Sequence, residues 1–263
     1  MEHRSVETHF TDLHAGRTLT PADLDEEYAH RSPETPASAQ TTRWVRANFV
    51  SSLDGAISVE GRSGALGSMG DKTVFHRLRA LADVVLVGAG TARAEDYGGA
   101  VISAQDRGAR TARGQAPVPP IAVVTGSGRI DADSRLFSGE VPPLVITSKT
   151  APTERITPLR KAGAEVVIAG DDAVDPHAMI AALTERGLPR VLCEGGPHLF
   201  GDLIDTDLID ELCVTTSPHL VAGRGGRMAA SSADALRRMR RTALLTDQDG
   251  FLYTRWVRDR SQQ

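Results

Sequence analysis

Two segments of the chain place glycines directly after an apolar run and directly before a helix-like pattern. Residues 82–96 (ADVVLVGAGTARAED) turn at Gly88-Ala89-Gly90, and residues 191–204 (VLCEGGPHLFGDLI) turn at Gly195-Gly196. Such turns leave main-chain N–H groups free to donate to a phosphate, and glycine lets the ligand approach closely. Ligands of open α/β sheets collect at the carboxyl ends of the strands. The two turns therefore predict one site that could hold both ends of a pyrophosphate.

The first turn by itself does not identify a nucleotide site. A Rossmann fingerprint needs a third glycine where this chain has Arg93, and an acidic ribose ligand about 20 residues further on. A methyltransferase needs an acidic residue beside the first glycine, where Val87 stands, and no Walker loop occurs in the sequence. A tight turn is as good an interpretation of this segment alone, so the second turn is what favours a cofactor site.

Composition and charge exclude several classes of function. A chain of 263 residues that is 40% hydrophobic can bury one large core, and its net charge of −4 gives no basic surface for nucleic acid. No apolar run approaches a membrane span, and the N-terminus lacks a signal-peptide core, which predicts a cytoplasmic protein without membrane partners. Cys193 and Cys213 lie in apolar strand-like segments and are expected to be buried, reduced thiols. The histidines show no paired spacing, so no metal is expected.

Short apolar runs alternate with helical patterns from residue 43 onward. Strands are expected at residues 44–50, 83–88, 120–125, 143–148, 165–170 and 190–196, and helices at 71–82, 153–163 and 175–187. The strands are rich in Val and Ile without clean alternation, which is typical of strands covered on both faces. Residues 242–246 and 251–257 flank a glycine turn and predict an antiparallel hairpin. The predicted fold class is α/β, with a mixed, mostly parallel sheet and this C-terminal hairpin.

Two other stretches are expected to lie outside the sheet. Residues 1–40 are predicted to form an N-terminal helical arm and linker, with Thr20 as N-cap, Pro21 at the first helical position and the linker at 32–38. The main domain is predicted to span residues 41–260. Residues 99–118 are expected to form a mobile surface loop.

Three sequence blocks together resemble the pyrimidine reductases of riboflavin biosynthesis. They are S-L-D-G at residues 52–55, the segment 78–96 that contains the first glycine turn, and E-G-G-P-H-L at 194–199. The family comprises the C-terminal reductase domain of bifunctional deaminase-reductases and their stand-alone relatives, and the resemblance spans roughly residues 43–258. It implies a three-layer α/β/α fold like that of dihydrofolate reductase and a homodimer. The implied reaction is the NADPH-dependent reduction of the ribose of a phosphoribosylamino-pyrimidine to a ribityl chain.

The resemblance also implies the residues that bind the cofactor. The backbone of Val50 would meet the nicotinamide carboxamide, and Thr91 and Glu95 would lie on the adenosine and ribose side. The expected contacts to the phosphates and nicotinamide are Gly195, Gly196, Pro197, His198 and Leu199, with Gly88 and Gly90 supplied by the first turn. Arg93 is our own candidate for the cofactor's 2′-phosphate, because it lies beside the first turn and no ribose-binding acid is evident.

Ser63, Arg79 and Glu194 match substrate-binding positions of the family. Hydride delivery to an opened sugar carbon builds electron density on nitrogen, so a proton donor is needed, and Glu194 or Asp54 could supply or relay the proton. Structural alternatives remain open for each. Asp54 could cap the turn at Gly55, Arg79 could pair with Asp83 four residues on, and Ser63 could be a simple loop hydroxyl.

The chain departs from the bifunctional enzymes at several positions. The typical lysine before S-L-D-G is Asn48, as in the stand-alone type, the usual basic residue after D-G is Ala56, and the aromatic before the first helix is missing near Ala65 and Leu66. The H-x-E and P-C-x-x-C motifs of the zinc deaminase do not occur in the sequence. These departures leave a pterin or folate reductase, or a non-catalytic NADPH-binding protein, as alternatives.

Overall fold

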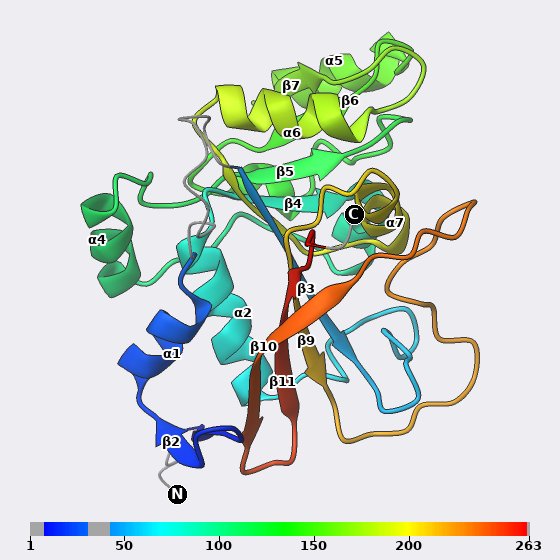
Figure 1. Ribbon diagram of the computed structural model, residues 1–263. Helices are drawn as coiled ribbons and strands as arrows, with labels where there is room; N and C mark the ends of the chain where they lie inside the picture. The colour runs from blue at the N-terminus through cyan, green and yellow to red at the C-terminus, as the bar shows by residue number, and fades with distance from the viewer. Residues whose placement is uncertain (1–7, 31–42, 262–263) are drawn as a thin grey trace, which may run out of the picture.

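The computed structural model describes residues 8–30 and 43–261, and their strands form one sheet of 11 strands (Figure 1). The strand order is β2-β1-β10-β11-β9-β3-β8-β4-β5-β6-β7. The bounds are β1 Phe10–Asp12, β2 Arg17–Leu19, β3 Trp44–Ser51, β4 Val84–Gly88, β5 Ile121–Val124, β6 Leu144–Thr147, β7 Glu165–Ile168, β8 Arg190–Cys193, β9 Glu211–Thr216, β10 Met239–Asp247 and β11 Leu252–Arg258.

The sheet is mixed, as expected. Every pair from β9 through β3, β8, β4, β5 and β6 to β7 is parallel. β11 runs antiparallel to both β9 and β10, and Gly250, with φ of +81°, makes the hairpin turn in the left-handed region that favours glycine. The predicted fold class is thereby confirmed.

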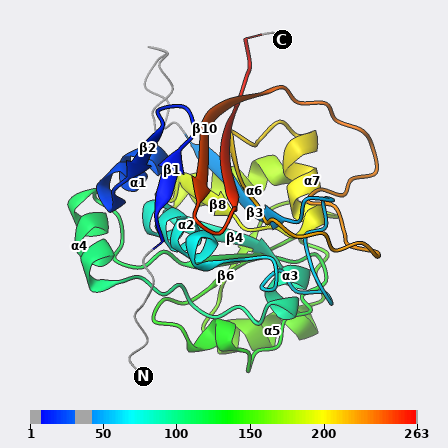
Figure 2. The same ribbon diagram turned by 90° about the horizontal axis from the view of Figure 1, so that it is seen from below.

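Helices cover both faces of the parallel strands, which explains why these strands are apolar without alternation (Figure 2). On β4, Val84 and Leu86 belong to the cluster that includes α6 and α7, whereas Val85 and Val87 belong to the cluster that includes α1 and α2. The helix bounds are α1 Pro21–Tyr28, α2 Met69–Leu81, α3 Ala89–Ala94, α4 Ala104–Ala112, α5 Thr153–Lys161, α6 Pro176–Glu185 and α7 Pro197–Asp205, and η1 Arg135–Ser138 is a short 3₁₀ turn.

The expectation of a mobile loop over residues 99–118 was wrong, because helix α4 occupies its centre. Ser103 caps the helix by accepting from the N–H of Asp106. Arg110 is fully buried, and its Nη1 donates to the carbonyls of Arg79, Ala80 and Ala82 at the end of α2. Helix α4 is polar because it holds the end of α2 through hydrogen bonds. The sequence therefore shows no apolar stripe there from which a helix could be predicted.

The described part of the N-terminal segment is more than a helical arm. Helix α1 is present with the expected Thr20 cap and Pro21 in its first turn. Strands β1 and β2, which we did not expect, extend the sheet by pairing of β1 with β10 and β2 with β1. The linker expected at residues 32–38 lies outside the described residues, and the division at residue 40 stays a prediction.

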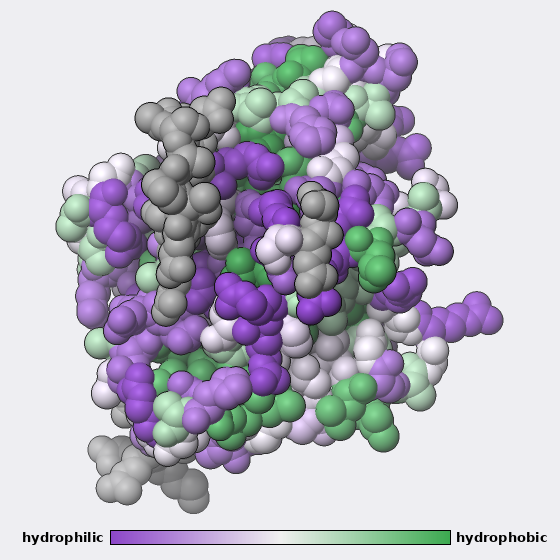
Figure 3. Space-filling view, viewed as in Figure 1, coloured by the Kyte–Doolittle hydropathy of each residue, from purple (hydrophilic) through white to green (hydrophobic). Residues whose placement is uncertain are grey.

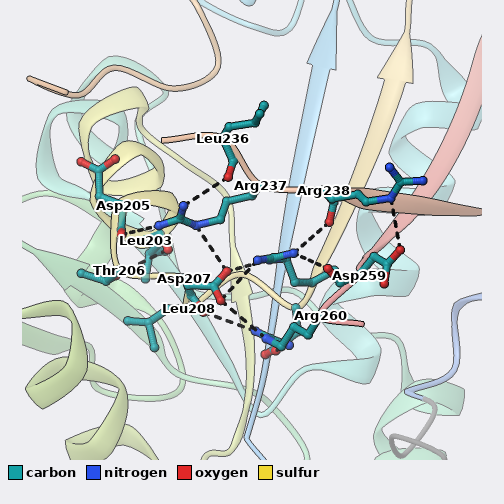
Figure 4. Close-up of polar contacts among 12 residues, drawn as sticks. Leu203, Asp205, Thr206, Asp207, Leu208, Leu236, Arg237, Arg238, Asp259 and Arg260 are labelled. Carbon is teal, nitrogen blue, oxygen red and sulfur yellow. Dashed lines mark hydrogen bonds and ion pairs between the residues drawn. The ribbon is translucent and has the colours of Figure 1, made fainter. Parts of the chain in front are cut away.

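A long connection, residues 217–238, links β9 to β10 without helix or strand and is fastened at one end by an ionic cluster. Figure 4 shows Asp207, which follows α7, facing the guanidinium groups of Arg237 and Arg260. Arg258 on β11 donates to the same carboxylate at 2.6 Å, and Arg237 lies 3.4 Å from it. The cluster joins the end of the connection and the last strand to the turn after α7.

The molecular face viewed in Figure 3 is mostly polar, with apolar residues in small separate groups. Among the described helices, none combines the length and the apolar character needed to cross a membrane.

Candidate active site

A cavity of about 310 Å³ opens at the carboxyl ends of β3, β4 and β8, where the sequence predicted a ligand site. Eight of the predicted site residues line it: Val50, Ser63, Thr91, Glu95, Glu194, Gly195, Gly196 and Pro197. Asn48, Asp71, Phe75 and Tyr97 complete much of its wall. The sequence did not single out the last three.

The two glycine turns lie side by side. The N–H of Gly88 donates to the carbonyl of Gly195 at 2.8 Å, and a Cβ on Gly88 would lie 3.3 Å from the nitrogen of Gly196. Gly195 has φ of +93°, and a Cβ on Gly196 would collide with the Thr91 hydroxyl. The peptide bond between Gly195 and Gly196 is cis. Side chains are therefore excluded where the turns meet, which leaves main chain and one hydroxyl to face a ligand.

Glu194 is held by three hydrogen bonds at the cavity wall. Arg79 at the end of α2 donates from Nε to Oε1 at 2.8 Å and from Nη2 to Oε2 at 2.7 Å, and the Tyr97 hydroxyl donates to Oε2 at 2.7 Å. Glu194 and Arg79 are 8% and 9% exposed. The alternative pairing of Arg79 with Asp83 is wrong, because Asp83 accepts from Arg190 at 2.8 Å.

Two aromatic rings flank the Arg79 guanidinium. Its carbon lies 4.2 Å from the centroid of Phe75 and 5.6 Å from that of Tyr97. Burial by itself would lower the pKa of Arg79, but the charge of Glu194 and its hydrogen bonds outweigh burial and raise this pKa above its usual value. Burial, followed by the charge of Glu194, holds the pKa of Tyr97 well above its usual range, so Tyr97 is a neutral donor. The sequence signal for Tyr97 was weak, since helix α3 lies between it and Gly88 of the first turn.

Ser63 and Glu95 meet at the cavity rim. The backbone N–H of Ser63 donates to Oε1 of Glu95 at 2.7 Å. A residue expected to bind substrate and one expected to bind cofactor are thus joined across 32 positions of the chain.

Asp54 does not line the cavity. Its exposed carboxylate accepts from the Ser52 hydroxyl at 2.5 Å and from the N–H groups of Val221 and Ala222 at 3.1 and 2.8 Å. The Ser52 hydrogen bond, followed by those of Ala222 and Val221, lowers the pKa of Asp54 to about 2. Asp54 therefore has a structural role, because its hydrogen bonds hold the S-L-D-G turn against the long connection after β9.

The remaining predicted residues also lie off the cavity lining. Arg93 is exposed and donates to the carbonyl of Arg129 at 2.6 Å, and His198 is exposed on the first turn of α7. Leu199 is buried in the core, and Gly90 is exposed at the start of α3. The structure brings Gly88 to the cavity only through its bond to Gly195.

The two cysteines are free and buried, as expected. Burial raises the pKa of the Cys193 thiol to about 12, so it is inert at neutral pH. Within the described residues, no group of three or more His, Cys, Asp and Glu side chains is arranged to hold a metal ion.

Comparison with known proteins identifies the family. The model of the RibD C-terminal domain matches residues 43–253, which include both glycine turns, Arg79 and Glu194. The chain belongs to this family. The resemblance drawn from the three sequence blocks is thereby confirmed.

Relatives of the RibD C-terminal domain family carry reductase names. The chain is 32% identical over 212 residues to the 2,5-diamino-6-ribosylamino-4(3H)-pyrimidinone 5′-phosphate reductase of Archaeoglobus fulgidus, covering 80% of this chain and 96% of that protein. It is 32% identical over 200 residues to the enzyme of the same name from Methanothermobacter thermautotrophicus, covering 74% and 89%. Among solved structures it resembles a pyrimidine reductase-like protein from Corynebacterium diphtheriae, with a TM-score of 0.77, 27% identity and coverage of 83% and 93%.

Proposed function

We propose that the protein is an NADPH-dependent reductase that converts the ribose of a phosphoribosylamino-pyrimidine in riboflavin biosynthesis to a ribityl chain. The observation that carries the proposal is the meeting of both glycine turns with the Glu194–Arg79–Tyr97 cluster at one cavity. The names of the family relatives support the same reaction.

The residues present fit a dinucleotide. Where Gly88, Gly195 and Gly196 meet, added Cβ atoms would press on Gly196, Phe49 and Thr91, so the main chain stays open to a phosphate. Helix α7 begins directly after Gly196, and the first N–H groups of a helix have no partner within it. Val50 at the end of β3 lines the same cavity and would offer its backbone to a nicotinamide. When bound, the reduced cofactor supplies the hydride.

Glu194 is suited to orient the substrate. Its two oxygens are fixed by Arg79 and Tyr97, and the two hydrogen bonds from Arg79 are charge-assisted. A carboxylate fixed in this way accepts hydrogen bonds from the hydroxyl or N–H groups of a sugar amine. Ser63 and Asn48, which also line the cavity, add a hydroxyl and an amide for further polar contacts.

Steady-state kinetics tests the proposal. Purified protein is assayed for NADPH oxidation with the 2,5-diamino pyrimidinone phosphate and, separately, with its deaminated uracil counterpart, and the product is identified by mass spectrometry. We expect a ribityl product, with the diamino compound preferred because the named relatives act on it. Turnover of dihydrofolate instead would favour the pterin alternative. NADPH binding without oxidation of the cofactor by any of these substrates would favour a non-catalytic role.

The preference for NADPH over NADH is proposed to depend on Arg93, the exposed cation nearest the first turn in sequence. Arg93→Ala is expected to raise the KM for NADPH about tenfold, equivalent to about 1.4 kcal/mol, and to leave the KM for NADH unchanged. Arg160→Ala, which removes an exposed cation from α5, is the matched control. An unchanged KM for NADPH would remove Arg93 from the cofactor site.

We also infer a cytoplasmic homodimer, as the family resemblance implies. Sedimentation equilibrium of the purified protein tests the dimer, and a monomer across the concentration range used in the assay would contradict it.

A further inference from the structure

Asp71 is a third carboxyl group in the wall of the cavity, and nothing described above gives it a role. It lies in the first turn of α2, where its N–H donates to the capping hydroxyl of Ser68 at 3.1 Å. This bond fixes the backbone of Asp71 at the start of the helix. The side chain also lies close enough to Thr215 on β9 for that hydroxyl to lower the pKa of Asp71. Asp71 is therefore fixed at the start of α2 and lines the space that the substrate would occupy.

The three carboxyl groups that line the cavity differ in their partners. Glu194 is paired with the cation Arg79, and Glu95 accepts from the backbone N–H of Ser63. Asp71 forms no ion pair within the described residues, and the side chain with the strongest effect on its pKa is Thr215, a neutral hydroxyl. Burial raises the pKa of Asp71, and the Thr215 hydroxyl and the charge of Lys72 oppose this effect more weakly. The groups whose charge or hydroxyl acts on the pKa of Asp71 are Lys72 on its own helix and Thr215 on β9, and Asp71 in turn raises the pKa of the neutral phenol of Tyr253 on β11.

The proposed reaction needs a proton at a defined atom. The ribose is a closed ring in which C1′ carries the amine nitrogen and the ring oxygen. To open it, the bond between C1′ and the ring oxygen breaks, its electron pair remains on that oxygen, and the nitrogen lone pair forms a C=N bond. The oxygen takes up one proton and becomes a hydroxyl. With a hydride that a reduced cofactor held at the glycine turns would supply, C1′ gains a hydrogen and two electrons. The C=N pair returns to nitrogen, so one proton is consumed per turnover.

We propose that Asp71 is the general acid that gives this proton to the ring oxygen of the substrate. The proposal rests on the proposed function and divides the work between two carboxyl groups that line the cavity. Glu194, fixed by three donors, orients the sugar, and Asp71 carries the proton and is reprotonated by solvent after each turnover.

Asp71→Asn tests the role directly, because the amide keeps the size of the carboxyl group but has no acidic proton. We expect kcat to fall about 10²- to 10⁴-fold, the usual contribution of a general acid. The dissociation constant for NADPH, measured by fluorescence titration, is expected to change less than about threefold. Glu154→Gln, an exposed carboxyl group on α5, is the matched control and should leave both values unchanged.

The pH profile gives a readout that a structural role would not move. Since Asp71 must be protonated to act, kcat of the wild type should fall as pH rises through the pKa of Asp71, and this limb should disappear in Asp71→Asn. Thr215→Val removes a donor that favours the carboxylate, so it should move the limb to higher pH. Infrared difference spectra of the cofactor-free protein should show a protonated carboxyl band that is absent from Asp71→Asn.

Two results would overturn the proposal separately from the proposed function. One is an active wild type whose Asp71→Asn variant keeps kcat within about threefold and retains the limb. If Asp71→Asn does not fold, as judged by circular dichroism, an unmoved limb in Thr215→Val is the second. A wild type that binds NADPH but reduces neither pyrimidine phosphate overturns the proposed function, and the role of Asp71 with it.

Discussion

The molecule contains two buried clusters in which arginine surrounds a glutamate, and they serve different purposes. One is Glu194 with Arg79 at the cavity, and the other is Glu211 with Arg46 and Arg255, where β3, β9 and β11 pass under α1. The exposed fraction of both glutamates is below one tenth. They differ in whether any side of the carboxylate faces a cavity.

Glu211 is enclosed on every side. It accepts from Trp44 at 2.8 Å, from Nη2 of Arg46 at 3.0 Å and from Arg255 at 2.6 Å, and it is 0% exposed. Nε of Arg46 lies 2.9 Å away as an ion-pair contact. The same arginines donate onward to the carbonyls of Tyr28 and Glu27, which end helix α1. The cluster therefore fastens the N-terminal helix to the sheet.

Glu194 has the same partner type but keeps one side facing the cavity. Arg79 and Tyr97 donate hydrogen bonds to its two oxygens, and the side of the carboxylate that faces the cavity can accept from a ligand. A buried carboxylate–arginine pair has a structural role when protein donors fill all acceptor sites of the carboxylate. It can bind a ligand when one side of the carboxylate faces a cavity.

Removing Glu211 is expected to have the largest effect of any single change in these clusters. Glu211→Ala leaves Arg46 buried without its counter-ion and Arg255 with only the longer contact to Glu27, which should lower the free energy of unfolding by about 3–5 kcal/mol. Urea unfolding followed by circular dichroism measures it. Glu165→Ala removes an exposed pair with Arg186 and should cost less than about 1 kcal/mol. Equal losses in the two variants would contradict the structural role of Glu211.

The same cluster predicts how stability depends on pH. Burial alone would raise the pKa of Glu211, but the charges of Arg46 and Arg255 outweigh it and lower this pKa from 4.5 to about 2. Since the folded pKa lies below the unfolded one, this stabilisation, about 3 kcal/mol, is fully present above the unfolded pKa and lost as pH falls through the folded pKa. Urea unfolding between about pH 5 and pH 2 should show a steeper acid limb in wild type than in Glu211→Ala. Parallel limbs would show that other groups dominate.

At the cavity the main loss should be in catalysis. Glu194→Gln removes the charge but keeps an acceptor oxygen, and we expect kcat/KM for the pyrimidine phosphate to fall about 100-fold, equivalent to about 2.7 kcal/mol. Its cost in unfolding free energy should be smaller than that of Glu211→Ala, because water in the cavity can reach the polar groups left behind. If the two variants lose stability equally and Glu194→Gln keeps its activity, the distinction between the clusters fails.

The smallest change sharpens the comparison within the cavity. Tyr97→Phe removes one of the three donors to Glu194 and keeps the ring beside Arg79, so kcat/KM should fall about fivefold, equivalent to about 1 kcal/mol. Thermal unfolding should be nearly unchanged. A large fall in melting temperature with unchanged kinetics would make Tyr97 a structural residue.

Local sequence patterns determined much of the fold. The apolar runs around Val84–Gly88 and Arg190–Cys193 predicted strands covered on both faces, and the glycine turn before Phe251 predicted the hairpin. The cap at Thr20 placed α1. These features depend on side-chain periodicity and on neighbours within a few residues, and the sequence alone shows both.

The partners within the site were decided by the tertiary structure. Arg79 has Asp83 four residues away in sequence, yet it pairs with Glu194 across 115 positions because β8 and β4 are neighbours in the sheet. Asp71 and Thr215 meet because β9 joins the other side of β3. The sequence by itself determined most strands of the parallel part, the C-terminal hairpin, the cap of α1 and the two glycine turns, but not β1, β2 or β9. Only the order of the strands decided which side chains share the cavity, since that order follows from burying both faces of the sheet at once rather than from any local pattern.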